Sequence, residues 1–254
     1  MRYYPLIDKR ISCENITNQI TKADTNKKNT FTNNIADAEA FLVAGGDWFM
    51  LQNIRKYIDH RKPFVWYNCG TLWFLMNHVQ SIHELPIKFT TMTKINSQII
   101  ELTIKTKDWK THQGFCINDV TIGDKLTDYF QFTVHTGKWE NKIQWTWLVI
   151  ATSIWATWYT LNLWTPILPL QSQLWTMAGI WTRPFHFKYL EPTTSTIFIS
   201  GRKPVDIACD GHKQIFHHVT NVTLKTSQKY ITLWFCPQQD FESKRVVLAA
   251  QKLW

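Results

Sequence analysis

The chain has 254 residues, a formal net charge of +9, 44% hydrophobic residues and 19% charged residues. This composition is that of a globular protein rather than a disordered one, and the length suffices for one large domain or two modest ones. The basic residues are scattered along the chain and form no continuous block, which favours a solvated basic surface over a nucleic-acid-binding one.

The cysteines and the hydropathy pattern bear on the compartment. The five cysteines lie far apart and show no metal-ligand spacing, so we expect reduced thiols, with neither a disulfide framework nor a zinc site. The chain begins without a signal-peptide pattern, and we expect a cytoplasmic protein. Residues 145–170 carry no charge, but their threonines, prolines and β-branched residues are poor helix formers, so we exclude a transmembrane helix.

The first part of the chain predicts a strand that ends in a glycine turn. Residues 1–39 are polar, apart from a possible strand at Tyr3–Ile7. Ala40–Ala44 is an apolar run that predicts a buried strand, and Gly45-Gly46-Asp47 follows directly. We expect glycine to give a positive φ at this turn, with backbone N–H groups facing an anion.

A helix and a second strand follow this turn. Phe49–Ile58 has the apolar spacing of an amphipathic helix, and Pro63–Tyr67 predicts the next strand. A strand, a helix and a strand within thirty residues predict a βαβ unit with a parallel sheet. Ligands of such sheets bind at the carboxyl ends of the strands, where Asp47 would lie.

After about residue 86 the apolar period changes from 3.6 to 2. Ile100, Leu102 and Ile104 alternate with polar residues, as in a half-buried strand. Further short strands are expected at Cys116–Ile122, Tyr129–His135, Leu148–Ala151, Thr196–Ser200, Val219–Leu224 and Tyr230–Phe235. We therefore predict a strand-rich second domain with a boundary near residue 90, and a closing element at Phe241–Leu253.

Four motifs occur in a fixed order along the chain. They are Gly45-Gly46-Asp47, then Asn68-Cys69-Gly70-Thr71-Leu72 with Phe74-Leu75, then Asn118-Asp119, then the segment that holds Thr157 and Tyr159. This order resembles the NAD kinase family, whose pattern is GGDG, N-x-G-x-L-G-F-L, N-E/D and G-D-G-x-x-x-x-T-x-x-G-S-T-A/G-Y. The resemblance covers Ala40 to about Pro169 and continues more loosely to the C-terminus.

The resemblance implies a fold and a reaction. The fold would be an α/β, Rossmann-like N-terminal domain (1–90, with about 237–254 returning to it) and an all-β, β-sandwich-like dinucleotide-binding domain (91–236). The reaction would transfer the γ-phosphoryl group of ATP or polyphosphate to the 2′-hydroxyl of the adenosine ribose of NAD, with Mg²⁺, to give NADP. The family also implies a dimer or tetramer.

The resemblance also implies roles for single residues. Asp47 would be the base near the attacking hydroxyl, or it would help to hold Mg²⁺; the sequence leaves both roles open. Gly45 and Gly46 would form the turn that faces the phosphates. The residues implied to contact the NAD adenosine or the nucleotide are Asn68, Phe74, Asn118, Asp119, Thr157 and Tyr159. A carboxylate suits a ribose diol because it accepts two hydrogen bonds.

The departures from the family pattern follow one rule. Tryptophan stands at family glycine or small-residue positions: Trp48, Trp66, Trp73, Trp145, Trp147, Trp155, Trp158 and Trp164. The chain has 14 Trp and 9 Gly, whereas a usual glycine share of about 7% would give roughly 18. We interpret these tryptophans as glycines encoded by UGA and translated as tryptophan. Two further departures, Thr146 and Ile154, replace an Asp and a small hydroxyl residue of the family pattern.

Two alternatives remain beside the NAD kinase hypothesis. A lipid kinase of the diacylglycerol-kinase type shares the glycine-rich turn, but the Asn68–Leu75 segment and the Thr157/Tyr159 segment argue against it. The second alternative is a non-catalytic dinucleotide-binding protein. Genuine tryptophans at these positions would favour it, because an indole at Trp48 would occupy the space of the phosphates.

Overall fold

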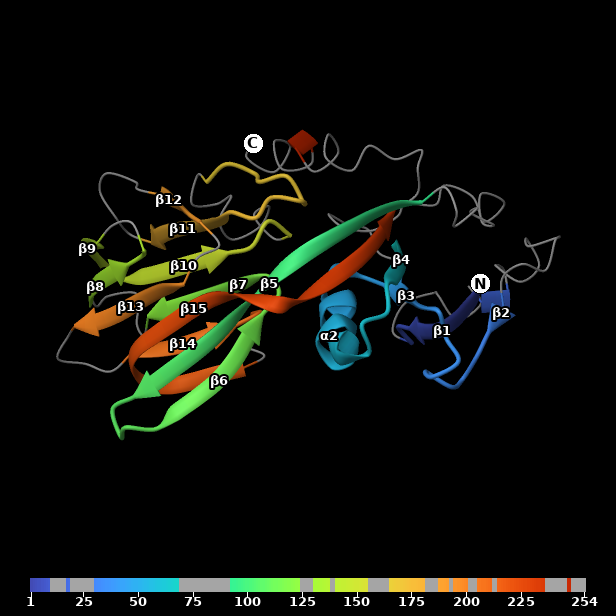
Figure 1. Cartoon of the computed structure of the whole chain (residues 1–254), viewed down its shortest axis with the longest axis horizontal. Helices are drawn as coiled ribbons and strands as arrows, with labels where there is room; N and C mark the ends of the chain where they lie inside the picture. The colour runs from blue at the N-terminus through green and yellow to red at the C-terminus, as the bar shows by residue number, and fades with distance from the viewer. Residues whose placement is uncertain are drawn as a thin grey trace. The chain divides into compact units, whose positions relative to one another are not determined.

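The computed structural model describes residues 1–9, 17–18, 30–68, 92–123, 130–137, 140–154, 165–180, 187–191, 194–200, 205–211, 214–235 and 246–247. The chain divides into two compact units. Unit 1 consists of Met1–Asn96 and Lys229–Ala250, and unit 2 consists of Ser97–Gln228 and Gln251–Trp254. Figure 1 labels their strands and the helix α2.

Unit 1 contains a parallel sheet. Its described strands pair in the order β2-β1-β3-β4-β15, which are Thr30–Phe31, Arg2–Ile7, Ala40–Gly45, Phe64–Asn68 and the last part of Gln214–Phe235. Every one of these pairings is parallel. Helix α2 (Asp47–Tyr57) connects β3 to β4 through the short 3₁₀ helix η1 (Ile58–His60). The predicted βαβ unit is therefore confirmed, within two residues at each boundary.

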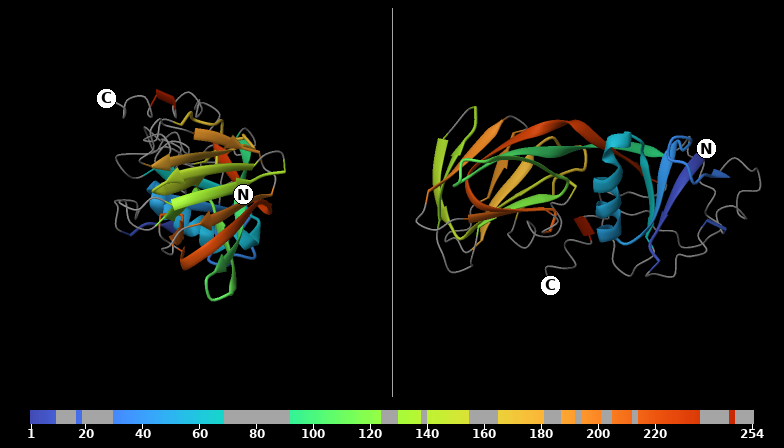
Figure 2. Two further views of the ribbon diagram at one scale, coloured as in Figure 1. Left: turned by 90° about the vertical axis from the view of Figure 1, so that its left-hand side faces the viewer. Right: turned by 90° about the horizontal axis from the view of Figure 1, so that it is seen from below.

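Both faces of β3 are covered, which explains its unbroken apolar sequence. All six of its residues are buried. On one face Phe41 stacks on Phe64 at 5.0 Å between ring centroids, and the Tyr57 ring of helix α2 lies 5.1 Å from Phe41. On the other face Leu42 packs in a cluster with Val65 and residues of the neighbouring strands. Figure 2, in its right-hand view, shows α2 lying along one face of the strands of unit 1.

Unit 2 is built from antiparallel strands. The described strands of one path are β7 (Asp119–Gly123), β10 (Trp147–Ala151), β11 (Trp175–Ile180), β12 (Phe187–Leu190) and β14 (Val205–Cys209). They pair in the order β12-β11-β10-β7-β14-β15. The remaining strands are β5 (Thr93–Thr106), β6 (Thr111–Cys116), β8 (Phe130–His135), β9 (Glu140–Trp145) and β13 (Ser195–Ser200). In this path β7 lies between β10 and β14, with antiparallel partners on both sides.

Alternating apolar residues of these strands form the core of unit 2. Ile100, Leu102 and Ile104 are fully buried in it, as their period of two predicts. Trp145 and Trp175 belong to the same core. Trp145 lies so close to the Gly179 backbone that a Cβ there would be 2.1 Å from the indole. The core of unit 2 is thus fitted around at least one indole that faces a glycine.

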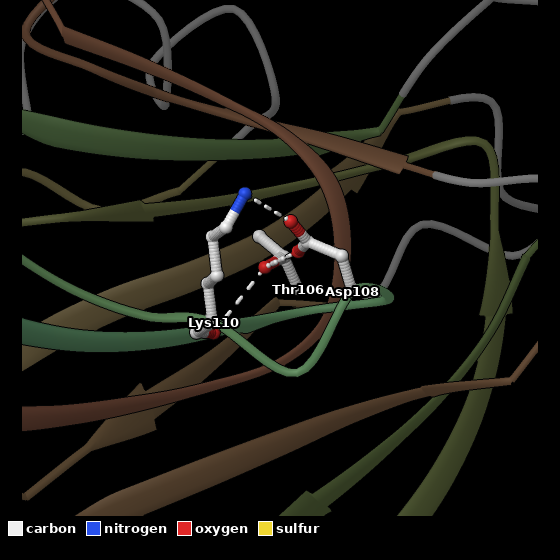
Figure 3. Close-up of polar contacts among 3 residues, drawn as sticks. All are labelled: Thr106, Asp108 and Lys110. Carbon is white, nitrogen blue, oxygen red and sulfur yellow. Dashed lines mark hydrogen bonds and ion pairs between the residues drawn. The ribbon is translucent and has the colours of Figure 1, made fainter.

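The β5–β6 hairpin ends in a tight turn (Figure 3). The Trp109 N–H donates to the Thr106 carbonyl oxygen at 3.0 Å, and the Thr106 N–H donates to the Lys110 carbonyl oxygen at 3.1 Å. The Asp108 carboxylate accepts from the Thr106 hydroxyl at 2.5 Å and pairs with Lys110 Nζ at 2.7 Å. These contacts, that with Lys110 first, lower the pKa of Asp108 to about 2. Trp109 itself adopts φ 65° with its side chain 95% exposed.

The predicted strand boundaries were wrong in two places, in opposite ways. Cys116–Ile122 was expected as one strand, but β6 ends at Cys116 and β7 begins at Asp119, because a turn at Ile117–Asn118 separates them. Val219–Leu224 and Tyr230–Phe235 were expected as two strands, but both belong to the single strand β15. Among the described residues no helix is long and apolar enough to cross a membrane. Apart from Val246 and Val247, the expected closing element at Phe241–Leu253 lies outside the described residues.

Candidate functional site

The Gly45-Gly46-Asp47 segment lies at the carboxyl end of β3. Gly45 is the last residue of that strand, Gly46 is the N-cap of helix α2, and Asp47 is the first residue of the helix. The N-terminal end of a helix favours anions, because its first N–H groups have no partner inside the helix and the helix dipole is positive there. The segment therefore combines a carboxylate with a backbone arrangement that suits phosphate groups.

The glycines of this turn do not have the expected backbone geometry. Gly46 has φ −96° and ψ 171°, which any residue can adopt, and the only described glycine with a positive φ is Gly211. Gly45 is required for a different reason. A Cβ at Gly45 would lie 2.7 Å from Cδ1 of Phe49 and 3.1 Å from the Cβ of Asp8, whereas a Cβ at Gly46 would meet nothing within 4 Å. Gly45 therefore allows helix α2 to begin close to the strand, and Gly46 leaves open space beside the turn.

Two further residues of unit 1 lie at the same edge of the sheet. Asn68 ends β4 and is the register partner of Gly45. Asp8 directly follows β1, is buried, and donates its N–H to the Ala44 carbonyl oxygen at 2.9 Å. Asp8 was not among the site residues predicted from the sequence, although it follows an apolar strand as Asp47 does.

Asn118 and Asp119 form a second polar turn, in unit 2. Asn118 precedes β7 and Asp119 is its first residue. The two side chains are 3% and 4% exposed. Neither Oδ1 of Asn118 nor Oδ2 of Asp119 has a hydrogen-bond partner in the part of the chain that the structure describes. Unpaired buried oxygens of this kind are costly, so they mark a place where a ligand that donates hydrogen bonds would be stabilised.

The electrostatics of this turn are unusual. Burial, with the nearby carboxylate of Asp210 as a second cause, raises the pKa of Asp119 to about 7. A carboxyl group with such a perturbed pKa in a polar turn is a candidate for a functional site. A ligand that donates hydrogen bonds to the Asp119 carboxylate would lower this pKa again and so favour the ionised form.

Asp210 is a second site residue that was not predicted from the sequence. It follows β14 and is 3% exposed, and its carboxylate accepts from the N–H groups of Ile117 and Asn118. On the other side of the turn, Thr152 donates its hydroxyl to the Ile117 carbonyl oxygen. The Asp210-Gly211 pair is a recognisable turn signal, but nothing local in the sequence connects it with Asn118.

The other predicted site residues can be placed only in part. Phe74, Thr157 and Tyr159 lie outside the described residues, and of Asn68 only the backbone is described. The two departures from the family pattern, Thr146 and Ile154, are both buried in unit 2. In unit 1 the structure brings two predicted residues together, Gly45 and Asn68. In unit 2 the described pair, Asn118 and Asp119, is already consecutive in the sequence.

The fold is that of NAD and NADH kinases of known structure. Yeast NADH kinase complexed with NADH superposes with a TM-score of 0.76 at 13% identity, over 97% of this chain and 86% of that one. An NAD kinase from Archaeoglobus fulgidus in complex with ATP superposes with a TM-score of 0.71 at 12% identity, over 98% and 99% of the two chains.

Sequence relatives point to the same family. The chain is 29% identical over 225 residues to the NAD kinase of Rickettsia felis, and 28% identical over 220 residues to that of Rickettsia bellii. Both similarities cover 83% of this chain and 85% of the relative. No protein-family model matches the chain. The sequence relatives and the shared fold confirm the resemblance to the NAD kinase family that the four ordered motifs indicate.

Proposed function

We propose that this protein is an NAD kinase, which transfers the γ-phosphoryl group of ATP to the 2′-hydroxyl of the adenosine ribose of NAD and so produces NADP. The observation that carries the proposal is the buried Asn118–Asp119 turn, in a chain whose relatives are NAD kinases. Two side-chain oxygens of this turn have no hydrogen-bond partner among the described residues, and they suit a ribose and an adenine. ATP as the phosphate donor is supported by the similarity to an NAD kinase in complex with ATP.

Asp47 is the proposed general base. The attacking 2′-hydroxyl must lose its proton as the bond to phosphorus forms, and a carboxylate within hydrogen-bond reach accepts it. Asp47 starts helix α2, so its position is fixed by β3 on one side and by the helix on the other. Backbone N–H groups at the start of the helix, next to Gly46, would face the phosphates. Gly46 suits that task because the space where a Cβ would stand is open.

Asn118 and Asp119 are the proposed dinucleotide-binding pair. The ionised carboxylate of Asp119 accepts two hydrogen bonds from a ribose diol, and the Asn118 amide both accepts and donates at an adenine edge. Such bonds would satisfy oxygens that have no partner among the described residues. Asn68, Phe74, Thr157 and Tyr159 remain proposed nucleotide contacts on the family pattern alone.

Mg²⁺ fits this proposal as a companion of ATP. The described residues contain no group of three or more His, Cys, Asp or Glu side chains that would hold a metal ion alone. Mg²⁺ in phosphoryl-transfer sites is usually held by substrate phosphates with one or two carboxylates, and Asp47 is the proposed protein ligand where one is needed. The ion would neutralise charge on the transferring phosphoryl group.

The finer description of the fold is also part of the proposal. Unit 1 would be a Rossmann-like domain and unit 2 a β-sandwich-like dinucleotide-binding domain, as in the sequence-based division into 1–90 with 237–254 and 91–236. A homo-oligomer and a cytoplasmic location are proposed as well. Size-exclusion chromatography with light scattering measures the first, and fractionation of the source cells measures the second.

The test is NADP formation from NAD and Mg-ATP by two forms of the chain. The printed form has the sequence as given, and the glycine form carries glycine at positions 48, 66, 73, 145, 147, 155, 158 and 164. We expect NADP formation by the glycine form. A folded glycine form that binds NAD but makes no NADP would favour the non-catalytic dinucleotide-binding protein instead. Phosphorylation of lipid vesicles by either form would favour the diacylglycerol-type kinase.

A further inference from the structure

The backbone of the turn before β7 is held by two residues that the proposed reaction does not use. The Asp210 carboxylate accepts from the Ile117 N–H at 2.9 Å and from the Asn118 N–H at 2.8 Å. The Thr152 hydroxyl donates to the Ile117 carbonyl oxygen at 2.6 Å, and the Thr152 N–H donates to the Asn118 carbonyl oxygen at 2.8 Å. Both N–H groups and both carbonyl oxygens of Ile117 and Asn118 are therefore bonded.

The sheet explains why these two residues meet the turn. β7 pairs with β10 on one side, where Ala151 lies opposite Asp119, and with β14 on the other, where Cys209 lies opposite Val120. Thr152 is the residue after β10 and Asp210 is the residue after β14. Each therefore reaches the turn from one of the two neighbouring strands, at a position set by the sheet register.

Asp210 is itself held in an uncommon conformation. It adopts φ 50°, and Gly211 after it adopts φ 63°. Its own N–H donates to the Asp119 carbonyl oxygen at 3.0 Å. A left-handed conformation at a residue other than glycine costs free energy, and Asp is among the residues that tolerate it. The chain turns here so that the carboxylate points back at the Ile117 and Asn118 N–H groups.

Packing alone does not explain Asp210, which places a second buried carboxylate beside Asp119. Two carboxylates close together repel each other, and burial removes the solvent that would screen them. A neutral amide or hydroxyl would cap these N–H groups at less electrostatic cost. The Asp210 carboxylate has only acceptor atoms: its Oδ1 accepts from both N–H groups, and its Oδ2 also accepts from the Ile117 N–H at 3.2 Å.

We propose that Asp210 and Thr152 are positioning residues, which hold the Ile117–Asp119 backbone so that the side chains of Asn118 and Asp119 remain available to the dinucleotide. This inference rests on the proposed function, because the ligand is the NAD of that reaction. With the backbone groups bonded to Asp210 and Thr152, the Asn118 and Asp119 side chains have no need to cap their own turn.

The test uses three variants and a control in both the printed and the glycine form. Asp210→Asn keeps the size and shape of the side chain, but its NH₂ group would replace the Oδ2 that accepts from the Ile117 N–H at 3.2 Å and would face that donor. Thr152→Val removes the hydroxyl, and Thr152→Ser restores it. Ser153→Ala is the matched control, because Ser153 also donates a buried hydroxyl to a carbonyl oxygen, that of Leu170 at 2.9 Å, away from this turn.

Three readouts separate positioning from general stability. For Asp210→Asn and Thr152→Val we expect faster hydrogen exchange at the Ile117 and Asn118 amides. We also expect the Kd and KM for NAD to rise about tenfold, with the KM for ATP changed by less than about twofold. Thr152→Ser should return these values toward those of the unaltered protein, and Ser153→Ala should leave NAD binding unchanged. If Asp210→Asn does not fold, the comparison of Thr152→Val with Thr152→Ser tests the inference by itself.

Different results would contradict the proposed function and the positioning inference. If the unaltered protein in neither form binds NAD, the proposed function is wrong. If it binds NAD, and folded Asp210→Asn and Thr152→Val bind NAD equally well, the proposed function stands and the positioning inference is wrong. An equal rise in the KM for NAD and for ATP would also contradict it, because that result indicates a general loss of structure.

Discussion

The two turns that carry the proposed chemistry are built in different ways. The Gly45-Gly46-Asp47 turn is made by consecutive residues, since β3 ends, a glycine caps the helix and Asp47 begins it. The Asn118–Asp119 turn is held by two residues that are remote in the sequence: Thr152, 35 positions after Ile117, and Asp210, 92 positions after Asn118. The first turn therefore has its geometry from local chain direction, and the second has its geometry from the sheet of unit 2.

The difference in construction corresponds to a difference in proposed task. A base for phosphoryl transfer needs one carboxylate at a fixed place beside the phosphates, which a strand–helix junction provides. Recognition of a dinucleotide needs several polar groups with unsatisfied oxygens, which remain unsatisfied only if other groups bind the backbone. The comparison yields four predictions, in decreasing order of effect.

Asp47→Asn should have the largest effect, on turnover. Loss of the general base should lower kcat for NADP formation by about 10² to 10⁴ fold, with little change in stability. Asp59→Asn is the matched control, because Asp59 is an exposed carboxylate of unit 1 paired with Lys229. Steady-state rates in the glycine form measure both. A kcat for Asp47→Asn within about threefold of the unaltered value would exclude Asp47 as the base.

Asp119→Asn should change the pH dependence of stability. The pKa of Asp119 is raised from 3.8 to about 7 in the folded protein, so between these values the folded state binds more protons than the unfolded state. The contribution of this group to stability therefore falls as the pH rises from about 4 to 7. Asparagine does not ionise, so the stability of the variant does not fall in this pH range. The variant should be more stable than the unaltered protein by about 2 to 4 kcal/mol at pH 8, and by almost nothing near pH 3.

Urea unfolding of both proteins at several pH values measures this difference. A stability difference that does not vary between pH 4 and pH 8 would contradict the assigned pKa shift. The experiment also shows whether Asp119 is kept at the expense of stability, as expected of a residue that serves a ligand.

Gly45→Ala and Gly46→Ala should separate structure from ligand approach within one turn. The new methyl group at position 45 would meet the Phe49 ring, so we expect a loss of about 1 to 3 kcal/mol of stability. At position 46 there is open space and an ordinary backbone conformation, so we expect a stability change below about 0.5 kcal/mol. A raised KM for ATP should accompany Gly46→Ala, because a methyl group would stand between the phosphates and the backbone. Equal stability losses at both positions would contradict this distinction.

Trp109→Gly should stabilise the protein by about 1 kcal/mol, because an αL conformation costs a residue other than glycine about that much. Trp109 has φ 65° after a tight turn, the position that glycine usually fills in hairpins of this kind, and its indole contributes little burial. Trp175→Gly is the control: Trp175 is a core residue, and the variant should lose several kcal/mol. Urea midpoints measure both. The genomic codon at position 109 gives an independent answer, since UGG there would exclude a misread glycine.

Local patterns of the sequence were sufficient to predict the βαβ unit of unit 1. β3, helix α2 and β4 were predicted because an apolar run, a period of 3.6 and a second apolar run are local signals. The same patterns could not give backbone angles: glycine was expected at a positive φ, but Gly45 is needed for the close approach of Phe49. That requirement depends on where the helix packs, which the sequence does not state.

Unit 2 was less predictable, because its decisive contacts are remote in sequence. The alternation around Ile100, Leu102 and Ile104 predicted a strand with one buried side. The break between Cys116 and Asp119 was not predicted, since it depends on hydrogen bonds to Asp210 and Thr152. Asn118 and Asp119 themselves were predicted from the resemblance to NAD kinases, whereas the residues that hold them required the structure.

The most direct test of the account is a calorimetric titration of NAD onto Asp47→Asn and Asp119→Asn in the glycine form. Asp47 is proposed to act in the chemical step, and Asp119 is proposed to bind the dinucleotide. We therefore expect Asp47→Asn to bind NAD with a Kd within about threefold of the unaltered protein, and Asp119→Asn to bind at least about tenfold more weakly. Unchanged affinity in Asp119→Asn, or a large loss confined to Asp47→Asn, would contradict the account.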